Sequence, residues 1–301
     1  MNASRKPLFG FGLVVGAAFL WAVIPISLKK IGNTFDAYTI TWLRFAVSAV
    51  LFFVFAYIQG EIKRLQKRDV WLMVLAGGGI GFNYVLYTLG IKFTTASAGN
   101  VVVNLEAVWL VILGRLWLKE RIGGLKLAGT LITFAGVFAA IWTGDGFCAL
   151  IKSKYFLGNM LIAACAPFWA IYGVGQKLLV ERDVPVTATL AGIFAVAAVF
   201  VSPMVVAGYH INPPISTSVW IWMFVLIVPA TLGSYLLMGK SLEFLDASSV
   251  AVASCILPVI TILAARIFLD EMITSTVVMG ALLVAVGMII TGRAEVDAAQ
   301  S

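Results

Sequence analysis

The sequence predicts an all-α integral membrane protein whose ten transmembrane helices form two inverted five-helix repeats. Of the 301 residues, 61% are hydrophobic and 12% are charged, and the mean hydropathy is +1.02. A soluble domain averages about 45 to 50% apolar residues, so one soluble core could not bury this much apolar surface. The second observation is internal: shifting the chain along itself by 151 residues aligns membrane-type sequence in its two halves.

The two copies share identical residues at many aligned positions. The matched pairs include Gly129 with Gly280, Gly136 with Gly287, Tyr84 with Tyr235 and, at a slightly smaller shift, Trp21 with Trp169. An odd number of spans in the first copy makes the second copy enter the membrane upside down, as in many secondary transporters. We therefore expect one five-helix repeat at residues 8–143 and a second, inverted one at residues 155–292.

Five apolar runs in the first copy are long enough to cross a bilayer, for which a helix needs about 20 residues. They are residues 8–28, 37–57, 70–90, 96–118 and 125–142. The first run follows Arg5 and Lys6 but is longer than the apolar region of a signal peptide, so we expect a permanent helix. Glycines at 77–79 and 81 in the third run favour close helix packing in lipid.

Five corresponding runs follow in the second copy. They are residues 155–175, 186–208, 219–238, 247–269 and 273–291. The connections between runs are short, so the sequence predicts one membrane domain without a soluble module. The basic stretch 61–69, between the second and third runs, is typical of a solvated anchor at the cytoplasmic face.

The formal net charge of +7 would suggest a nucleic-acid partner in a soluble protein, but here the positions of the charges matter more. When the N-terminus is placed in the cytoplasm, most Lys and Arg residues fall in cytoplasmic segments, as the positive-inside rule requires. We therefore expect a lipid bilayer and no nucleic acid as partner, with both termini in the cytoplasm.

Residues that support catalysis or hold cofactors are scarce. The three cysteines provide no disulfide framework, and His210 is the single histidine. Metal centres need clustered His, Cys or carboxylate ligands, and serine hydrolases need a base beside the nucleophile. The sequence therefore predicts no enzyme, no metal and no cofactor.

A motif recurs in the two copies. The first copy has Thr94-Thr95-Ala96-Ser97, Asn104-Leu105-Glu106-Ala107-Val108 and Leu118-Lys119-Glu120-Arg121. The second copy has Leu245-Asp246-Ala247-Ser248, Ile256-Leu257-Pro258-Val259 and Leu269-Asp270-Glu271. Together with Leu43-Arg44-Phe45, these segments resemble the signature of the EamA family in the drug/metabolite transporter superfamily. Ala107 departs from the proline common there, which Pro258 keeps in the second copy.

The resemblance implies a ten-helix carrier with a central cavity in the bacterial plasma (inner) membrane, typically exporting amino acids or related small metabolites. We expect alternating access, with the two halves rocking around a site at the membrane midplane. The alternatives are an uptake or exchange carrier for amines, nucleotide sugars or sugar phosphates, and a channel. A monomer can enclose such a path, and glycine-rich faces would also support a homodimer.

Positions that are polar in one copy and apolar in the other are the candidates for a substrate site, because a charge inside the membrane costs at least about 2.5 to 3.5 kcal/mol. The candidates are Arg44 against Ile193, Glu106 against Leu257, Asn104 against Cys255 and, as a milder case, Asn83 against Ser234. The strong polarity therefore lies in the first copy.

Glu106 and Arg44 each have several interpretations. Glu106 lies near the middle of its run, where it could neutralise a substrate amine, carry a proton and so couple transport to protons, or hold a neighbouring helix. Arg44 could hold a carboxylate with its planar guanidinium or simply pair with Glu106. If both residues bind substrate, the cavity suits a zwitterion.

Aromatic residues recur at similar depths. The candidates are Trp21, Tyr84, Trp169, Tyr172 and Tyr235. Some aromatic residues of membrane proteins form belts at the interface, but this set permits a pseudo-symmetric aromatic lining suited to apolar side chains or to a cation over ring faces.

Overall fold

The computed structural model describes residues 6–117, 122–142, 147–208, 210–213, 215–241, 244 and 256–300. The motif residues at 118–121 and 245–255 lie outside these ranges, as does the first part of the ninth expected span. Within the described ranges the chain is helical, apart from turns, loops and one isolated bridge between Phe35 and Ile211.

The helices of the first copy follow the expected runs. They are α1 (Lys6–Ile31), α2 (Ala37–Ile58), α3 (Val70–Phe93), α4 (Ala96–Val102), α5 (Leu105–Trp117) and α6 (Gly124–Ile141), with 3₁₀ turns η2 (Glu61–Arg64) and η3 (Lys67–Asp69). The short helix α7 (Phe147–Lys152), which the sequence did not predict, lies between the copies.

The second copy has an equivalent series. Its helices are α8 (Phe156–Val180), α9 (Val186–Gly208), α10 (Thr217–Ile227), the π-helical segment η4 (Val228–Gly233), α11 (Ser234–Ser241), α13 (Leu257–Leu269) and α14 (Ser275–Gln300). Among the described residues, nine helical segments are long and apolar enough to cross a membrane, and Leu257–Leu269 is a shorter apolar helix. The prediction of an all-α membrane fold is confirmed.

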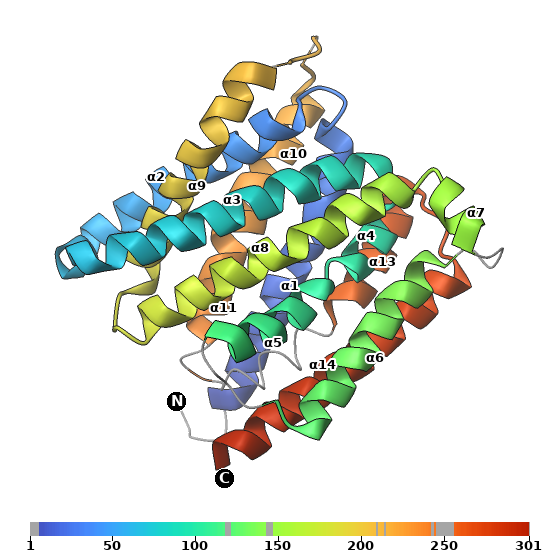
Figure 1. The fold of residues 1–301 in the computed structure, drawn as a ribbon. Coiled ribbons are helices and arrows are strands. Elements are labelled where there is room, and N and C mark those ends of the chain that lie inside the picture. The colour runs from blue at the N-terminus through green and yellow to red at the C-terminus, as the bar shows by residue number, and fades with distance from the viewer. Residues whose placement is uncertain are drawn as a thin grey trace.

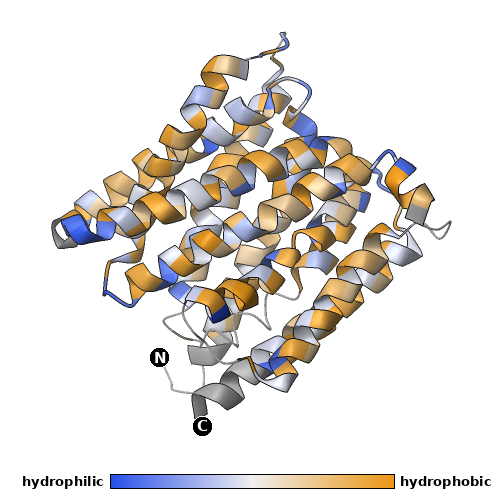
Figure 2. Cartoon of the chain, viewed as in Figure 1, coloured by the Kyte–Doolittle hydropathy of each residue, from blue (hydrophilic) through white to orange (hydrophobic). Residues whose placement is uncertain are grey.

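The outer surface is apolar along the helices. Figure 2 shows hydrophobic residues along the lengths of the helices and hydrophilic residues gathered mainly at their ends and in loops. Large exposed side chains include Val50, Phe53, Leu131, Phe134, Trp220, Phe224 and Ile267. A soluble protein rarely exposes so much contiguous apolar surface, whereas hydrocarbon chains solvate it.

Several helix contacts recur when the two copies are exchanged. α3 packs on α8, and its counterparts α10 and α11 pack on α1. In the same way α5 packs on α8 and α13 on α1, while α3 packs on α9 and α10 on α2. The equivalent helices α2 and α9 contact each other, as do α6 and α14 (Figure 1). Two copies related by a two-fold axis, as the sequence repeat predicts, would produce such paired contacts.

Glycines show that α6 and α14 run in opposite directions. A Cβ atom at Gly129 would lie 2.7 Å from the carbonyl oxygen of Gly287, and one at Gly136 would lie 2.9 Å from that of Gly280. Residue numbers therefore rise along α6 where they fall along α14. Because these helices are equivalent in the two copies, their antiparallel contact is what inverted repeats require.

Glycines also bring α3 close to α8 and α9. A Cβ atom at Gly90 would lie 2.9 Å from the carbonyl oxygen of Gly158, and one at Gly79 would lie 2.8 Å from that of Phe168. A Cβ atom at Gly77 would lie 2.6 Å from the carbonyl oxygen of Ile193 on α9. The predicted packing role of this glycine cluster is confirmed at Gly77 and Gly79, where small residues let helix backbones approach in lipid.

Hydrogen bonds link the two copies at the end of the bundle that holds the α1–α2 loop, here called the α1–α2 end. Thr94 Oγ1 donates to Asn159 Oδ1 over 2.6 Å. Glu271 accepts hydrogen bonds from the backbone N–H groups of Ala96 and Ser97 and from Ser97 Oγ, at 2.6, 3.1 and 2.9 Å. The side chain of Glu271 thus caps α4, which belongs to the other copy.

Asp36 joins two loops at the same end. Its Oδ1 accepts hydrogen bonds from the backbone of Tyr38 and Thr39 at the start of α2, both at 2.9 Å. Its Oδ2 accepts from Thr39 Oγ1 at 2.6 Å and from the backbone of His210, in the α9–α10 loop, at 3.1 Å. Burial alone would raise the pKa of Asp36, but these hydrogen bonds outweigh it and lower the pKa below its usual value.

The fourth expected span is present as the helical segment Ala96–Trp117, but a turn at Val103 and Asn104 divides it into α4 and α5. The chain leaves α4 after Val102 and re-enters a helix at Leu105. Asn104 Nδ2 donates to the carbonyl oxygens of Asn100 and Val101, acceptors that a regular helix would use for its backbone. The backbone then forms bonds three residues apart, such as Glu106 N to Val103 O at 3.0 Å, so a local amide competes with the helix.

The eighth span is also irregular where a regular helix was expected. η4 is π-helical and begins with Val228 and Pro229, whose ring removes a backbone donor. Thr231 Oγ1 donates to Leu226 O, five residues back, at 2.8 Å. The remaining differences are at helix ends.

Candidate functional site

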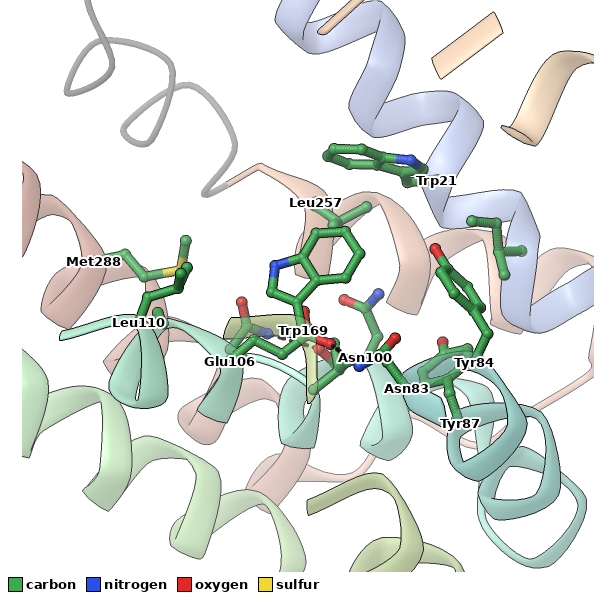
Figure 3. Close-up of a pocket in the computed structure, with 14 residues that line it drawn as sticks. Trp21, Asn83, Tyr84, Tyr87, Asn100, Glu106, Leu110, Trp169, Leu257 and Met288 are labelled. Atoms are coloured by element: carbon green, nitrogen blue, oxygen red, sulfur yellow. Dashed lines mark hydrogen bonds between the residues drawn. The ribbon is translucent and has the colours of Figure 1, made fainter. Parts of the chain in front are cut away.

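A cavity of about 210 Å³ lies between the two copies. Its walls come from α1, α3, α4, α5, α8, α13 and α14, with Val103 and Asn104 contributed by the turn between α4 and α5. The lining residues are Trp21, Ile24, Asn83, Tyr84, Tyr87, Asn100, Val103, Asn104, Glu106, Ala107, Leu110, Trp169, Leu257 and Met288 (Figure 3). Most of them are apolar or aromatic, and Glu106 is the charged residue among them.

Glu106 reaches the cavity because the fourth span is interrupted just before it. The residue lies in the first turn of α5, where the positive end of the helix dipole favours a negative charge. Its Oε1 accepts a hydrogen bond from Asn83 Nδ2 at 2.9 Å, and the side chain is partly exposed to the cavity. The interruption therefore places a carboxylate beside an open space inside the bundle.

Asn83 holds this carboxylate in place. The residue is 2% exposed on α3, and its Nδ2 also donates to the carbonyl oxygen of Cys165 on α8 at 2.9 Å. Because both partners are acceptors, the amide must turn its NH₂ group towards them. The hydrogen bonds thus connect α3, α5 and α8 at the cavity.

Three further polar groups line the space. Asn104 directs its NH₂ group to backbone carbonyls. Asn100, which is 3% exposed, has a buried Oδ1 atom without a hydrogen-bond partner among the described residues. Trp21 Nε1 is likewise buried without an acceptor in the described part of the chain. Unpaired buried polar atoms at a cavity are the groups that a ligand can satisfy.

The aromatic side chains form a cluster in which two pairs occupy aligned positions of the two copies. The ring centroids of Trp21 and Tyr235 are 5.9 Å apart, and those of the equivalent pair Trp169 and Tyr84 are 6.5 Å apart. Tyr172 bridges the two pairs, at 5.1 Å from Trp169 and 6.4 Å from Tyr235. In Figure 3, Trp21, Tyr84 and Trp169 surround the same space.

Arg44 lies behind this cluster. Its side chain is 1% exposed, its guanidinium carbon lies 3.9 Å from the ring centroid of Tyr84, and its Nε donates to Thr231 Oγ1 at 2.5 Å. Both Nη atoms are buried and find no hydrogen-bond partner among the described residues. The Tyr84 ring therefore contacts the cavity and also covers the guanidinium.

The structure brings most of the predicted site residues together. Six line the cavity: Trp21, Asn83, Tyr84, Asn104, Glu106 and Trp169. Arg44, Tyr172 and Tyr235 do not line it but belong to the adjoining cluster. The suggested pairing of Arg44 with Glu106 is not present among the described residues: Glu106 is bonded to Asn83, and Arg44 to Thr231.

The sequence reasoning missed several lining residues. Asn100 stands opposite Ala251 when the copies are aligned, so the comparison that selected Asn104 would have selected it too. Tyr87 is one of the aromatic residues expected near this depth, one helical turn from Tyr84, but was not among the candidates for the site. Leu110 and Met288 carried no signal, because an apolar residue facing a cavity has the same sequence pattern as one facing lipid.

Comparison with known proteins identifies the family of this chain. The sequence profile of the EamA-like transporter family matches residues 8–142 and 156–293. An "Uncharacterized transporter" of Archaeoglobus fulgidus is 26% identical over 97% of this chain and 98% of its own length. An "Uncharacterized transporter" of Haemophilus influenzae is 26% identical over 59% of this chain, and the "Uncharacterized inner membrane transporter YhbE" of Escherichia coli is 23% identical over 58%. These two alignments span 58% of the length of the Haemophilus influenzae protein and 55% of the length of the Escherichia coli protein.

A solved structure shares the fold. A protein of known crystal structure aligns with 95% of this chain and 96% of its own, with a TM-score of 0.68 at 19% sequence identity. At this identity the likeness shows the fold alone.

Proposed function

Because this chain belongs to the EamA-like transporter family, a family of membrane transporters, we propose that it carries small solutes bearing a protonated amine, namely amino acids or related metabolites. One observation supports this most directly. Glu106 is partly exposed in a cavity between the copies, and that cavity is otherwise lined by aromatic rings, amides and apolar side chains. A carboxylate in such surroundings attracts a cationic group strongly, because little water screens it.

We propose that the two copies rock about the cavity by alternating access, with export as the direction. The antiparallel contact of α6 and α14 and the interchangeable packing pattern support inverted repeats, the architecture in which this motion is common. The proposal places the protein in a bacterial inner membrane, with both termini in the cytoplasm. One chain encloses the cavity, which supports the monomer as the transport unit.

Proton coupling follows from the same carboxylate. Glu106 is the charged group among the lining residues, so protonation and binding of a substrate ammonium compete for one site. Exchange of a proton for the substrate would drive export against a substrate gradient. A pH gradient across proteoliposomes should therefore speed transport by wild type.

The alternative substrates fit the cavity less well. Nucleotide sugars and sugar phosphates are anions and would meet Glu106 rather than a cation in the lining. The volume of 210 Å³ equals about seven water molecules at roughly 30 Å³ each, which is small for a nucleotide sugar. A channel would need rings of charged side chains or a carbonyl filter, and the described lining has neither.

Thermal stability of the detergent-purified protein tests the proposal. The probes are tryptophan, leucine, tyramine and glucose 6-phosphate, measured with wild type, Glu106→Gln and the control Glu181→Gln, an exposed residue at the end of α8. A ligand at 100 times its Kd should stabilise wild type by about 2.7 kcal/mol. We expect at least one amine-bearing probe to stabilise wild type and the control, and binding to weaken at least tenfold in Glu106→Gln.

Transport of the probes that bind is then measured in proteoliposomes, where the rate should saturate with concentration. Stabilisation by glucose 6-phosphate alone, or undiminished binding by Glu106→Gln, would contradict the proposed function.

A further inference from the structure

We infer that the preferred ligand is a monovalent amine with an apolar or aromatic body and no carboxylate. The inference rests on the proposed function and narrows its substrate class. It comes from the direction of the polar groups around the cavity and from the position of Arg44 outside it.

The cavity presents acceptors. The NH₂ groups of Asn83 and Asn104 are both occupied by acceptors within the protein, namely Glu106 and Cys165 for Asn83 and two backbone carbonyls for Asn104. Among the described residues, neither of these two amide oxygens accepts a hydrogen bond. Asn100 Oδ1 is buried without a partner among the described residues. A primary ammonium group has three donors and no acceptor, which matches a carboxylate surrounded by amide oxygens.

The buried positive charge beside the cavity does not line it. A substrate carboxylate would need Arg44, but the guanidinium is 1% exposed and lies against the Tyr84 ring at 3.9 Å. Trp21 Nε1 is the buried unpaired donor at the lining in the described structure, and a neutral N–H forms weaker bonds to carboxylates than a charged donor does. A zwitterion would therefore bring its negative charge near Glu106 without meeting a compensating cation.

The rest of the lining suits an apolar body. Tyr84, Tyr87, Trp21 and Trp169 present aromatic surface, and Leu110, Leu257 and Met288 present aliphatic surface. Aromatic faces attract cations, and they also stack on other rings. They therefore favour both the ammonium group and the aromatic ring of an arylalkylamine. Small linear polyamines would leave this surface unused and would bring a second charge into an apolar space.

Matched pairs of compounds test the inference. Tyramine and tyrosine differ only in the carboxylate, as do tryptamine and tryptophan. We expect each amine to bind purified wild-type protein at least tenfold more tightly than its amino acid, by thermal shift and by titration calorimetry. Equal or tighter binding of the amino acids would overturn the inference while leaving the proposed function intact. If none of the four compounds binds, the inference is overturned and the proposed function loses its support.

Variants at Tyr84 test the role of the ring as a cover. Tyr84→Phe keeps the ring over Arg44 and should keep the preference for the amine. Tyr84→Ala exposes the guanidinium, so the tenfold preference should shrink towards equality because the amino acid gains a partner. An unchanged preference in Tyr84→Ala would contradict the assigned role of Arg44. Thermal unfolding without ligand establishes that both variants are folded before binding is compared.

Discussion

Arg44 shows at the scale of one residue how a charge is held inside the helix bundle. Its guanidinium contacts the face of Tyr84 and donates to Thr231. A desolvated cation–π contact is worth about 2 kcal/mol or more, which offsets part of the cost of at least about 2.5 to 3.5 kcal/mol for a charge at this depth. The side chain thereby ties α2 to α3 and to η4, beside the cavity rather than in it.

Asp36 gives a prediction about pH. Its pKa is lowered in the folded protein, so its ionised form stabilises the fold above the unfolded pKa of about 3.9, and this contribution is lost as the pH falls through the lower folded pKa. Asparagine also caps helices but carries no charge. We therefore expect Asp36→Asn to lower the Tm at pH 7, and the difference from wild type to shrink as the pH falls below the unfolded pKa and through the lower folded pKa.

Thermal unfolding in detergent between pH 3 and pH 7 measures this difference. Asp183→Asn, at an exposed position after α8, is the matched control and should show no comparable dependence. A loss of Tm at Asp36→Asn that is the same at every pH would mean that the charge contributes nothing.

At the scale of the elements, the two irregular spans each present a polar side chain inside the bundle. The turn between α4 and α5 presents Glu106 to the cavity, and the π-helical turn of η4 presents Thr231 to Arg44. Regular helices bury their backbone groups within themselves, so a polar site in a membrane often lies where a helix is broken. The equivalent stretch before α13 lies partly outside the described residues.

The contact of α6 with α14 gives a prediction about packing. A Cβ atom at Gly129 would lie 2.7 Å from Gly287 O, whereas one at Gly12 in α1 meets nothing within 4 Å. Overpacking costs about 1 to 3 kcal/mol, while alanine is the better helix former by about 1 kcal/mol. We expect Gly129→Ala to lower the Tm and Gly12→Ala to keep or raise it.

The two variants carry the same chemical change, so differential scanning fluorimetry of both isolates the contact itself. Equal behaviour of the pair would show that α6 and α14 do not approach as closely as described.

At the scale of the whole molecule, Glu271 links the copies at the α1–α2 end. Under the proposed alternating access, this link would open once in each cycle. Charge-assisted hydrogen bonds such as those from Ala96 and Ser97 contribute about 1.5 to 3 kcal/mol each. We expect Glu271→Gln to shift the population towards opening at this end.

Accessibility of the cavity measures that shift. In protein whose native cysteines are replaced, Asn100→Cys places a thiol at the cavity, and a membrane-impermeant maleimide is added from the α1–α2 end. Labelling should be several-fold faster with Glu271→Gln than with the control Glu181→Gln. Equal rates would mean that the Glu271 bonds do not limit opening.

Much of this molecule could be predicted from its sequence. The length of the apolar runs predicts the spans, because it depends on local composition. Alignment of the two halves of the chain predicts the equivalence of α6 with α14. The break before Glu106 could not be predicted from the motif, since Ala107 replaces the usual proline and the break depends instead on the side chain of Asn104. The burial of Arg44 under Tyr84 could not be predicted either, because sequence gives the depth of a charge but not the direction in which it points.

The equivalence of Glu106 and Leu257 has a consequence for charge. Both residues line the cavity, so a symmetric assembly of two identical half-length chains would place two carboxylates there. In this chain one of the two positions holds leucine, so under the proposed function the site has a single negative charge and suits a cargo with one positive charge. Restoring the lost symmetry with Leu257→Glu would then convert a site for monocations into one that accepts diamines.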